Sequence, residues 1–280
     1  MKKAVVVFTK VPKVGEVKTR LTEARGGILT PEEANAFYEA SLLDVIDVCL
    51  SVGKVDVWIC YNHDGDRTYL QSLLAEINKP QGIAGIFSDQ GGSFDDCMQY
   101  ASDFLLRPGK ENRLADAVVI IGGDIPTLQP VILLDALEKL ETLSSTEAGQ
   151  KAALFNTSRE GSPIGACIVE GACQEGGFSL IGLTCTTPFN FQKVFYNMDG
   201  ITALDMLVDK AEAENIPFGR VEMIPDVDIP VDLASLMPVL RALEISAKHD
   251  KSIFVPQRTI AFLREIGLQS LALPPVKEAI

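Results

Sequence analysis

Short apolar runs alternate along this chain with segments whose apolar residues recur at helical spacing. The first run, residues 4–8, is continuous and rich in valine, which is typical of a strand buried on both faces. Similar runs lie at residues 55–60, 83–87 and 117–121, with helical periodicity between them. This alternation predicts an α/β fold, in which helices cover both faces of a mostly parallel mixed sheet in three αβα layers.

Capping signals mark where several helices begin. Thr30, Pro31 and Glu33 form a capping box with proline at the first helical position, which predicts a helix to residue 50. Ser93 is placed to cap a helix that continues through residue 106. Periodicity also predicts helices at residues 67–77, 130–143, 201–214 and 233–247, and strands at residues 152–155, 165–169, 178–183 and 220–224.

The length of 280 residues permits one large domain. We expect residues 1–245 to form a single domain and residues 246–280 to form a helical C-terminal extension. Within this extension, an amphipathic pattern at residues 259–266 is expected to dock on the domain.

The charge of the chain excludes several kinds of partner. The 38 acidic residues outnumber the 25 basic ones, and the formal net charge is −13. General binding to nucleic acid or to an anionic membrane is therefore unfavourable, whereas a small anion held by a local group of cations is compatible with this charge. No apolar run approaches the roughly 20 residues of a membrane helix, so we expect no membrane span and a cytoplasmic location.

The cysteines and histidines do not form a recognisable site. The 6 cysteines show no CxxC pair and no zinc-finger spacing, which favours buried thiols over metal ligands or disulfides. His63 and His249 have no partner at a motif spacing, so neither is a persuasive base or ligand. We expect chemistry that does not require histidine.

Five cations cluster directly after the first predicted strand. Arginine can bind phosphate oxygens through two parallel hydrogen bonds and lysine supplies a point charge, so the cluster favours a phosphate ligand. Because open parallel sheets bind ligands at the carboxyl ends of their strands, the position of this loop supports that interpretation. The alternative is a solvated basic loop. The five cations are Lys10, Lys13, Lys18, Arg20 and Arg25.

Two familiar nucleotide-binding motifs are absent from this loop. A P-loop has glycine directly before its lysine and threonine, whereas Val17 precedes Lys18 and Thr19 here. Pro12 stands where the P-loop has its earlier glycine, and no GxGxxG follows the first strand. Gly15 still allows the backbone to approach a ligand closely.

Two aspartates are candidates for binding a divalent cation through oxygen ligands. Asp124 follows an apolar strand and lies between Gly123 and a nearby proline, which makes it the leading metal ligand. The alternative is an aspartate that only stabilises a turn. In the sequence DVDIPVDL at residues 226–233, Asp232 can lie at a helix N-terminus while Asp228 is left for the metal. The alternative is that both aspartates are helix caps.

A further candidate segment is EGGFSLIGL at residues 175–183. Its paired glycines, Gly176 and Gly177, let a backbone approach a ligand before the strand begins. Glu175 could bind the hydroxyls of a sugar or a positively charged acceptor. The alternative is a β-bulge without a ligand.

Together and in this order, these segments resemble the GT-A type nucleotide-diphospho-sugar transferase superfamily, in particular its DUF2064 glycosyltransferase group, which is related to the molybdenum-cofactor and phospholactate guanylyltransferases. The resemblance covers roughly residues 3–240. The KxPxxGxxKTRL loop of that group is matched at every fixed place, and its SDxP, DGGYYLIGL and DVDTPEDL motifs are matched at residues 123–126, 175–183 and 226–233. The residues that match the first motif are Lys10, Pro12, Gly15, Lys18, Thr19, Arg20 and Leu21.

The resemblance implies a GT-A-like domain that binds a nucleotide or sugar-nucleotide donor in its first half and a small-molecule acceptor in its second half. It implies that Lys18 and Arg20 bind phosphates with help from Lys10, and that Asp124 and Asp228 bind Mg²⁺ or Mn²⁺. Pro12, Gly15, Thr19 and Gly123 would belong to the nucleotide site, and Glu175, Gly176, Gly177 and Phe178 to the acceptor site. A homo-oligomer is compatible with this plan.

This chain departs from the family pattern on the acceptor side. Glu175 replaces the family's aspartate, which keeps the charge on a longer side chain. Phe178 and Ser179 replace its pair of tyrosines, so two tyrosine hydroxyls and their possible hydrogen bonds are lost. Ile229 and Val231 replace a threonine and a glutamate. These changes leave open a non-catalytic nucleotide-binding protein with a degenerate acceptor site.

The predicted activity is metal-dependent transfer of a glycosyl or nucleotidyl group, in which positioning and electrostatics do most of the work. Only one aspartate follows the strand at residues 117–121, which is not the DxD triplet of many glycosyltransferases. The density of cations in the first loop favours a triphosphate. The family label favours glycosyl transfer, so both reactions stay open.

Overall fold

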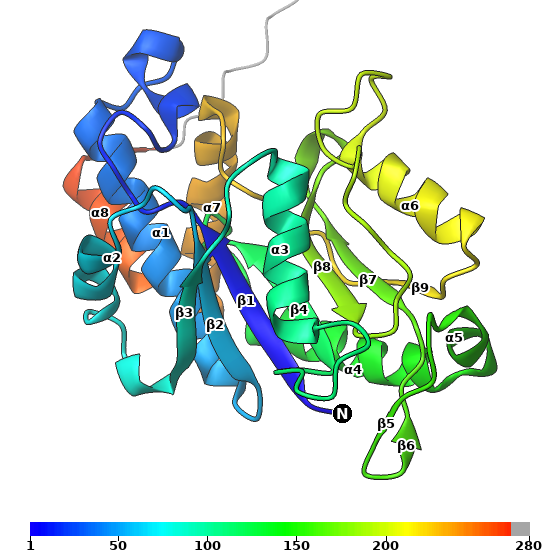
Figure 1. The fold of residues 1–280 in the computed structure, drawn as a ribbon. Coiled ribbons are helices and arrows are strands. Elements are labelled where there is room, and N and C mark those ends of the chain that lie inside the picture. Colours follow the sequence, from blue (N-terminus) through cyan, green and yellow to red (C-terminus); the bar gives the residue numbers. More distant parts are fainter. Residues whose placement is uncertain (270–280) are drawn as a thin grey trace, which may run out of the picture.

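The computed structural model describes residues 1–269, and residues 270–280 of the predicted extension lie outside this range. Its centre is a seven-stranded sheet with the spatial order β3-β2-β1-β4-β8-β7-β9 (Figure 1). The strands are β1 (Lys3–Thr9), β2 (Asp56–Tyr61), β3 (Ile83–Ser88), β4 (Ala117–Gly122), β7 (Ile168–Ala172), β8 (Phe178–Thr184) and β9 (Phe218–Arg220). A separate short hairpin is formed by β5 (Ser158–Arg159) and β6 (Ser162–Pro163).

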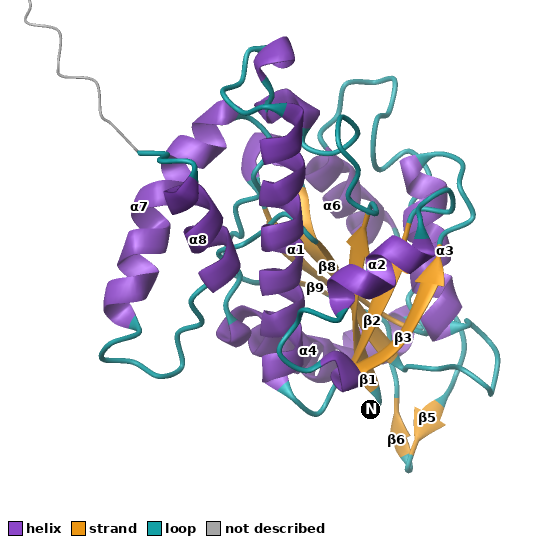
Figure 2. Cartoon of the chain, turned by 90° about the vertical axis from the view of Figure 1, so that its left-hand side faces the viewer, coloured by secondary structure: helices purple, strands orange, loops and turns teal. Residues whose placement is uncertain are grey.

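Helices cover both faces of this sheet, as Figure 2 shows for α1 and α2 on the near side. Their starts follow the capping signals: Thr30 and Ser93 each form a capping box at the N-terminus of a helix, α1 and α3. The helices are α1 (Pro31–Val52), α2 (Arg67–Leu74), α3 (Phe94–Leu106), α4 (Pro130–Ser145), α5 (Glu147–Ala152), α6 (Ala203–Ala213), α7 (Pro230–Ser246) and α8 (Gln257–Glu265).

Strand directions confirm the mostly parallel mixed sheet. The strand β1 pairs in parallel with both β2 and β4, and β2 pairs in parallel with β3. Only β8 runs antiparallel to its neighbours β4 and β7, whereas β7 and β9 are parallel to each other. The sheet therefore has one reversed strand between two parallel groups.

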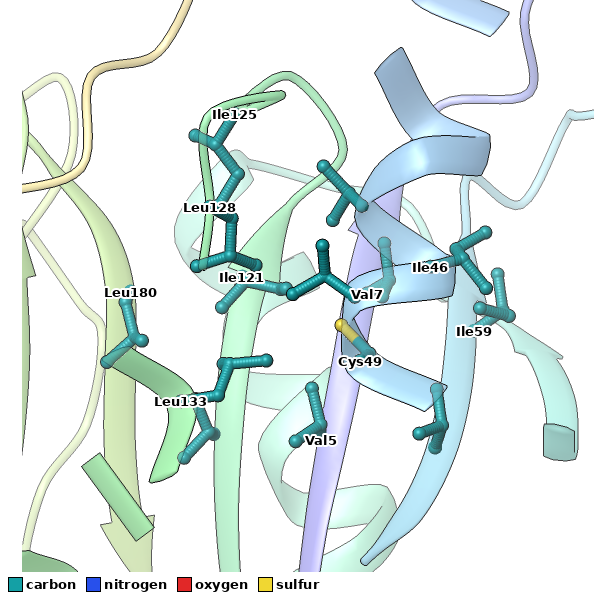
Figure 3. Close-up of a cluster of buried hydrophobic side chains, with 14 of the residues drawn as sticks. Val5, Val7, Ile46, Cys49, Ile59, Ile121, Ile125, Leu128, Leu133 and Leu180 are labelled. Atoms are coloured by element: carbon teal, nitrogen blue, oxygen red, sulfur yellow. The ribbon is translucent and has the colours of Figure 1, made fainter. Parts of the chain in front are cut away.

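Two apolar cores fill the spaces between the sheet and its helices. Alternate residues of β1 point to opposite faces, so Val5 and Val7 pack with α1, α2 and α4, while Ala4 and Val6 pack with α3 and α6. Figure 3 shows the first of these clusters. All four side chains are fully buried, which explains the continuous apolar run and confirms the three-layer prediction.

The strand order places a topological switch point between β1 and β4. The chain builds β1, β2 and β3 outward in one direction and then returns to place β4 on the other side of β1. The connections that leave the carboxyl ends of β1 and β4 therefore diverge and leave a crevice between them. The predicted basic loop and Asp124 follow these two strand ends.

Three predicted strands differ from the structure. Residues 152–155 are not a strand, because Thr146 caps α5 and this helix continues to Ala152. The predicted strand at 165–169 is displaced to β7, since the backbone of Gly165 lies against the backbone of Ser144 and Gly149. The predicted strand at 220–224 is observed as β9, and Val221 and Ile224 then donate single backbone hydrogen bonds to the β7 segment.

A third, smaller core joins the basic loop to the C-terminal helices. Leu21 from the loop is fully buried with residues of α1, α7 and α8, which include Phe37, Leu236 and Ile260. On α8, the guanidinium of Arg258 contacts Asp44 and Asp47 of α1. The packing of Leu21 therefore anchors the loop one residue after Arg20.

No helix within residues 1–269 is long and apolar enough to cross a membrane.

Candidate functional site

A cavity of about 490 Å³ opens at the carboxyl ends of β1 and β4. This volume lies in the range of ordinary small-molecule sites, and the position is the one expected for an open α/β sheet. Its charged lining residues, called the charged cluster below, are Lys10, Glu16, Lys18, Arg20, Asp124, Asp226 and Asp228. Its other prominent lining residues, called the aromatic cluster, are Phe8, Phe94, Phe178, Phe195 and Tyr196.

Lys18 is the centre of the charged cluster. Its Nζ lies 2.6 Å from Asp124 Oδ2 and 2.6 Å from Asp228 Oδ1, and its side chain is only 6% exposed. Burial alone would lower the pKa of Lys18, but the two carboxylates outweigh this effect and hold the pKa above its ordinary value. Lys18 therefore stays charged at neutral pH and neutralises two acids that are 104 residues apart in sequence.

The backbone of the loop directs this lysine inward. Lys18 has φ 47°, in the left-handed region, and precedes a 3₁₀ turn at Thr19–Leu21. A left-handed non-glycine residue costs about 1 kcal/mol or more. The buried Leu21 side chain and the ion pairs of Lys18 hold the loop in this conformation.

Arg20 contributes a cation that faces solvent. Its Nη1 lies 3.3 Å from Asp228 Oδ2, and its side chain is 61% exposed. The pKa of Asp228 lies below its usual value, because Lys18 and Arg20 together outweigh the effect of burial. Because most of its side chain is exposed, Arg20 can contact an incoming anion, whereas Lys18 is buried between two carboxylates.

Backbone contacts bring the two aspartates together. The residue after β4, Gly123, has no side chain and lies against Tyr38 and Leu42 of α1, and its carbonyl accepts a hydrogen bond from Ser41 Oγ. Farther along the chain, Val227 N donates to Asp124 O at 3.1 Å. This contact ties the 226–228 segment to the end of β4 and explains why Asp228 reaches Lys18.

Asp232 and Gln174 fix the shape of the second aspartate loop. Asp232 accepts hydrogen bonds from the backbone N–H groups of Asp228 and Ile229 in the first turn of α7, as predicted for a residue at a helix N-terminus. Gln174 exchanges hydrogen bonds with the backbone of Asp226 and also contacts Asp232. This glutamine connects the segment before β8 to the loop and was not predicted.

Asp226 is a further acid in the cavity whose role was not predicted. Burial, with added repulsion from Asp124 and Asp228, raises its pKa to about 6. Lys18 partly opposes this shift. The signal was present in the sequence as the first letter of DVDIPVDL, but one sequence does not show which of its aspartates face a cavity.

Ring contacts join the aromatic cluster into one surface. Phe94 makes edge-on contacts with Phe8 and Phe195, with ring centroids 5.7 Å and 4.7 Å apart. Tyr196 lies 6.5 Å from Phe94, and Phe178 lies 5.1 Å from Phe195. Of these residues, sequence reasoning selected only Phe178, because the others follow no motif.

The structure brings most of the predicted site residues to this cavity. Its lining includes Lys10, Lys18, Thr19, Arg20, Gly123, Asp124, Gly177, Phe178 and Asp228. Pro12, Gly15, Glu175 and Gly176 are not among the lining residues. Glu175 is exposed in a left-handed turn with φ 59°, and Ser179, in place of a family tyrosine, uses its hydroxyl to donate to Ile224 O.

Asp124 and Asp228 fit a divalent cation in the chemistry of their donor atoms. Their carboxylate oxygens converge on one point, the Lys18 Nζ, and hard oxygen ligands suit Mg²⁺ and Mn²⁺. Within residues 1–269, no three Asp, Glu, His or Cys side chains come close enough together to hold a metal by themselves. A cation here would take its other ligands from substrate phosphates and water, as Mg²⁺ commonly does.

The family model DUF2064, described as "Uncharacterized protein conserved in bacteria", matches residues 45–198, which is more than half of the chain. The chain belongs to this family. The finding confirms the resemblance found in the motifs, although the matched range includes neither the basic loop nor Asp228. None of the curated proteins matches the chain.

Comparison with solved structures supports the fold. A protein from Desulfovibrio desulfuricans G20, described as a "putative nucleotide-diphospho-sugar transferase", is 22% identical to the DUF2064 chain, with a TM-score of 0.66. The alignment covers 96% of this chain and 100% of that one. A cytidylyltransferase from Leptospira borgpetersenii is 13% identical, with a TM-score of 0.46 and coverage of 98% and 99%. The first likeness confirms the predicted fold.

Proposed function

We propose that this DUF2064 protein transfers a glycosyl or nucleotidyl group from a nucleotide-activated donor to a small acceptor, with Mg²⁺ or Mn²⁺ as its cofactor. The observation that carries the proposal is the meeting of Lys18 and Arg20 with Asp124 and Asp228 in one cavity at the switch point of the sheet. The fold shared with the D. desulfuricans protein agrees with a GT-A type transferase. The free cysteines agree with a reducing, cytoplasmic setting.

Each charged residue has a distinct part in this proposal. Arg20 binds phosphate oxygens of the donor with its exposed guanidinium, and Lys18 and Lys10 add positive charge on the same side. Asp124 and Asp228 hold the metal, which when bound neutralises negative charge on the leaving phosphate. Gly177 and Phe178, which also line the cavity, contact the acceptor.

Thermal unfolding in the presence of ligands tests this proposal. A ligand that binds only the native state raises the melting temperature, by an amount that grows with its concentration over Kd. Each nucleoside triphosphate and a set of sugar nucleotides would be added with MnCl₂ or with EDTA. We expect at least one nucleotide to stabilise the protein with Mn²⁺ and less so with EDTA. The absence of any stabilisation with metal would refute the proposal.

Product analysis then separates the two reactions. Nucleotidyl transfer from a triphosphate releases pyrophosphate, whereas glycosyl transfer releases a nucleoside phosphate from the sugar nucleotide. With a divalent cation offsetting Asp124 and Asp228, the lining cations would be left to contact phosphates, which favours the more highly charged triphosphate. Metal-dependent binding without either product across a broad acceptor panel would indicate a non-catalytic nucleotide-binding protein instead.

A further inference from the structure

The aromatic cluster forms a part of the cavity without charged side chains. In the described chain, every charged lining residue comes from residues 10–20, from Asp124 or from residues 226–228. The lining contributed by α3, β8 and the segment before α6 is aromatic or aliphatic, apart from the hydroxyls of Ser179 and Tyr196. A charged ligand group placed there would lose hydration without gaining a counter-ion. This part of the cavity therefore suits an uncharged group.

Several of these apolar side chains are exposed to solvent. Phe94 is 40% exposed, and Tyr196 is 87% exposed at the mouth of the cavity. The loop that joins β8 to α6, residues 185–202, is called the aromatic loop below, and it also exposes Met198, at 98%, and Ile201. Single exposed apolar residues are ordinary, but Phe94 and Tyr196 contact each other and line one cavity, which is typical of a binding surface.

Polar side chains of α3 bind the backbone of the loop that carries Phe195 and Tyr196. Asp95 accepts hydrogen bonds from the backbone N–H groups of Lys193 and Phe195, at 2.8 Å and 2.9 Å. Gln99 accepts a third from Phe191 N at 3.0 Å. These contacts join residues about a hundred positions apart and fix the loop before any ligand arrives.

The backbone of this loop is strained where the rings are presented. Lys193 and Tyr196 have φ values of 63° and 53°, in the left-handed region that is unfavourable for residues other than glycine. Such conformations persist where the surroundings impose them, and they concentrate at ligand sites. Tyr196 is thus held in a costly conformation although its ring is largely in solvent, where it contacts Phe94.

We propose that the acceptor presents an uncharged, apolar group, with an aromatic ring preferred, to Phe94, Phe178, Phe195 and Tyr196. This proposal rests on the proposed transfer reaction and names the class of its acceptor. Edge-on and tilted ring contacts like those within the cluster would extend to the acceptor. The polar group that receives the transferred moiety then faces the charged cluster in the same cavity.

A neutral fluorescent ring compound, N-phenyl-1-naphthylamine, tests the site without requiring turnover. We expect it to bind the full-length protein, and we expect Tyr196→Ser and Phe94→Ser each to raise its Kd about three- to tenfold. Leu154→Ser is the matched control, because Leu154 is also exposed but does not line the cavity. Thermal unfolding of each variant checks that the fold is retained.

Competition and acceptor assays complete the test. The stabilising nucleotide, with Mn²⁺, should leave probe binding unchanged, and phenyl β-glucoside should be a better acceptor than methyl β-glucoside by about tenfold in kcat/KM. Absence of probe binding, equal loss in the Leu154 control, or no preference for the phenyl acceptor would overturn the proposal.

Two other outcomes would assign the aromatic cluster differently. Displacement of the probe by the nucleotide would show that the rings bind the nucleobase of the donor. A dimer in sedimentation that Tyr196→Ser converts to a monomer would show that they bind a second copy of the chain. Either result overturns the acceptor proposal, whereas failure of every nucleotide to bind would refute the proposed function and leave probe binding as a separate result.

Discussion

The charged cluster and the aromatic cluster lie in one cavity but are held in place by different means. The charged side chains hold each other, since Lys18 bridges Asp124 and Asp228 directly. The aromatic loop is held from outside, by Asp95 and Gln99 of α3, which bind its backbone. In the charged cluster, the same residues determine stability and ligand binding. In the aromatic cluster, a ring can be substituted while the hydrogen bonds of Asp95 and Gln99 to the loop backbone are retained.

Removing Lys18 is expected to have the largest effect on stability. Lys18→Met leaves Asp124 and Asp228 close together without their common cation, and loss of one partner from a buried ion pair is strongly destabilising. Because both carboxylates are partly exposed, we expect a loss of about 2 to 3 kcal/mol in the free energy of unfolding, measured by urea titration in EDTA.

Lys13→Met is the control for this variant, since Lys13 lies in the same loop and pairs with Glu16 at the surface. It should leave the free energy of unfolding almost unchanged, because ion pairs at the surface contribute little to stability. Addition of Mn²⁺ should restore part of the stability of Lys18→Met, because the cation replaces the missing charge. Equal stability of the two variants in EDTA would show that the charged cluster does not hold itself together.

Removing the support of the aromatic loop is expected to have a smaller effect. Asp95→Ala removes the acceptor of two backbone hydrogen bonds, which predicts a loss of about 1 to 2 kcal/mol. Binding of N-phenyl-1-naphthylamine should weaken, while stabilisation by nucleotide with Mn²⁺ should not change. Asp199→Ala, in the same loop, is the control. If Asp95→Ala reduces nucleotide binding as strongly as probe binding, the two clusters are not independent.

The pH dependence of Asp226 provides the finest comparison. Its pKa of about 6 lies above the ordinary value of 3.8, so the native state binds this proton more tightly than the unfolded state. Its contribution to the free energy of unfolding therefore falls as pH rises from about 4 to 6. In EDTA, Asp226→Asn should be more stable than the original protein by about 1 kcal/mol at pH 7.5, a figure reduced for solvent screening, and equally stable near pH 3.5. Equal stability at both pH values would contradict the assigned burial and repulsion.

Local signals in the sequence were sufficient to predict much of the fold. The buried β1 run and the capping boxes of α1 and α3 involve residues within four positions of one another, so one sequence displays them. Of the four strands predicted after residue 150, the one at 178–183 agrees with β8, whereas the other three differ from the structure. The pairing of β9 with β7 and the close backbone approach at Gly165 join segments that are far apart in the chain, and no local pattern encodes their bounds.

The same distinction holds for the site. Lys18, Asp124 and Asp228 could be predicted to meet, because charged residues after strand ends follow a general rule for parallel sheets and match family motifs. The presence of Phe195 and Tyr196 in the cavity could not be predicted, because the position of their loop depends on a hydrogen bond to Asp95, which is 100 residues away from Phe195 in the chain. Apolar residues in a loop resemble any core residue until the fold shows them exposed.

Calorimetric titration of the stabilising nucleotide tests the central claim most directly, that the charged cluster is a metal-dependent nucleotide-phosphate site. With Mn²⁺, Arg20→Ala should raise the Kd by about 10- to 100-fold, because a charge-assisted contact is lost. Asp124→Asn should bind equally with Mn²⁺ and with EDTA, whereas the original protein should bind more tightly with Mn²⁺. Unchanged affinity in Arg20→Ala, together with unchanged metal dependence in Asp124→Asn, would contradict the account.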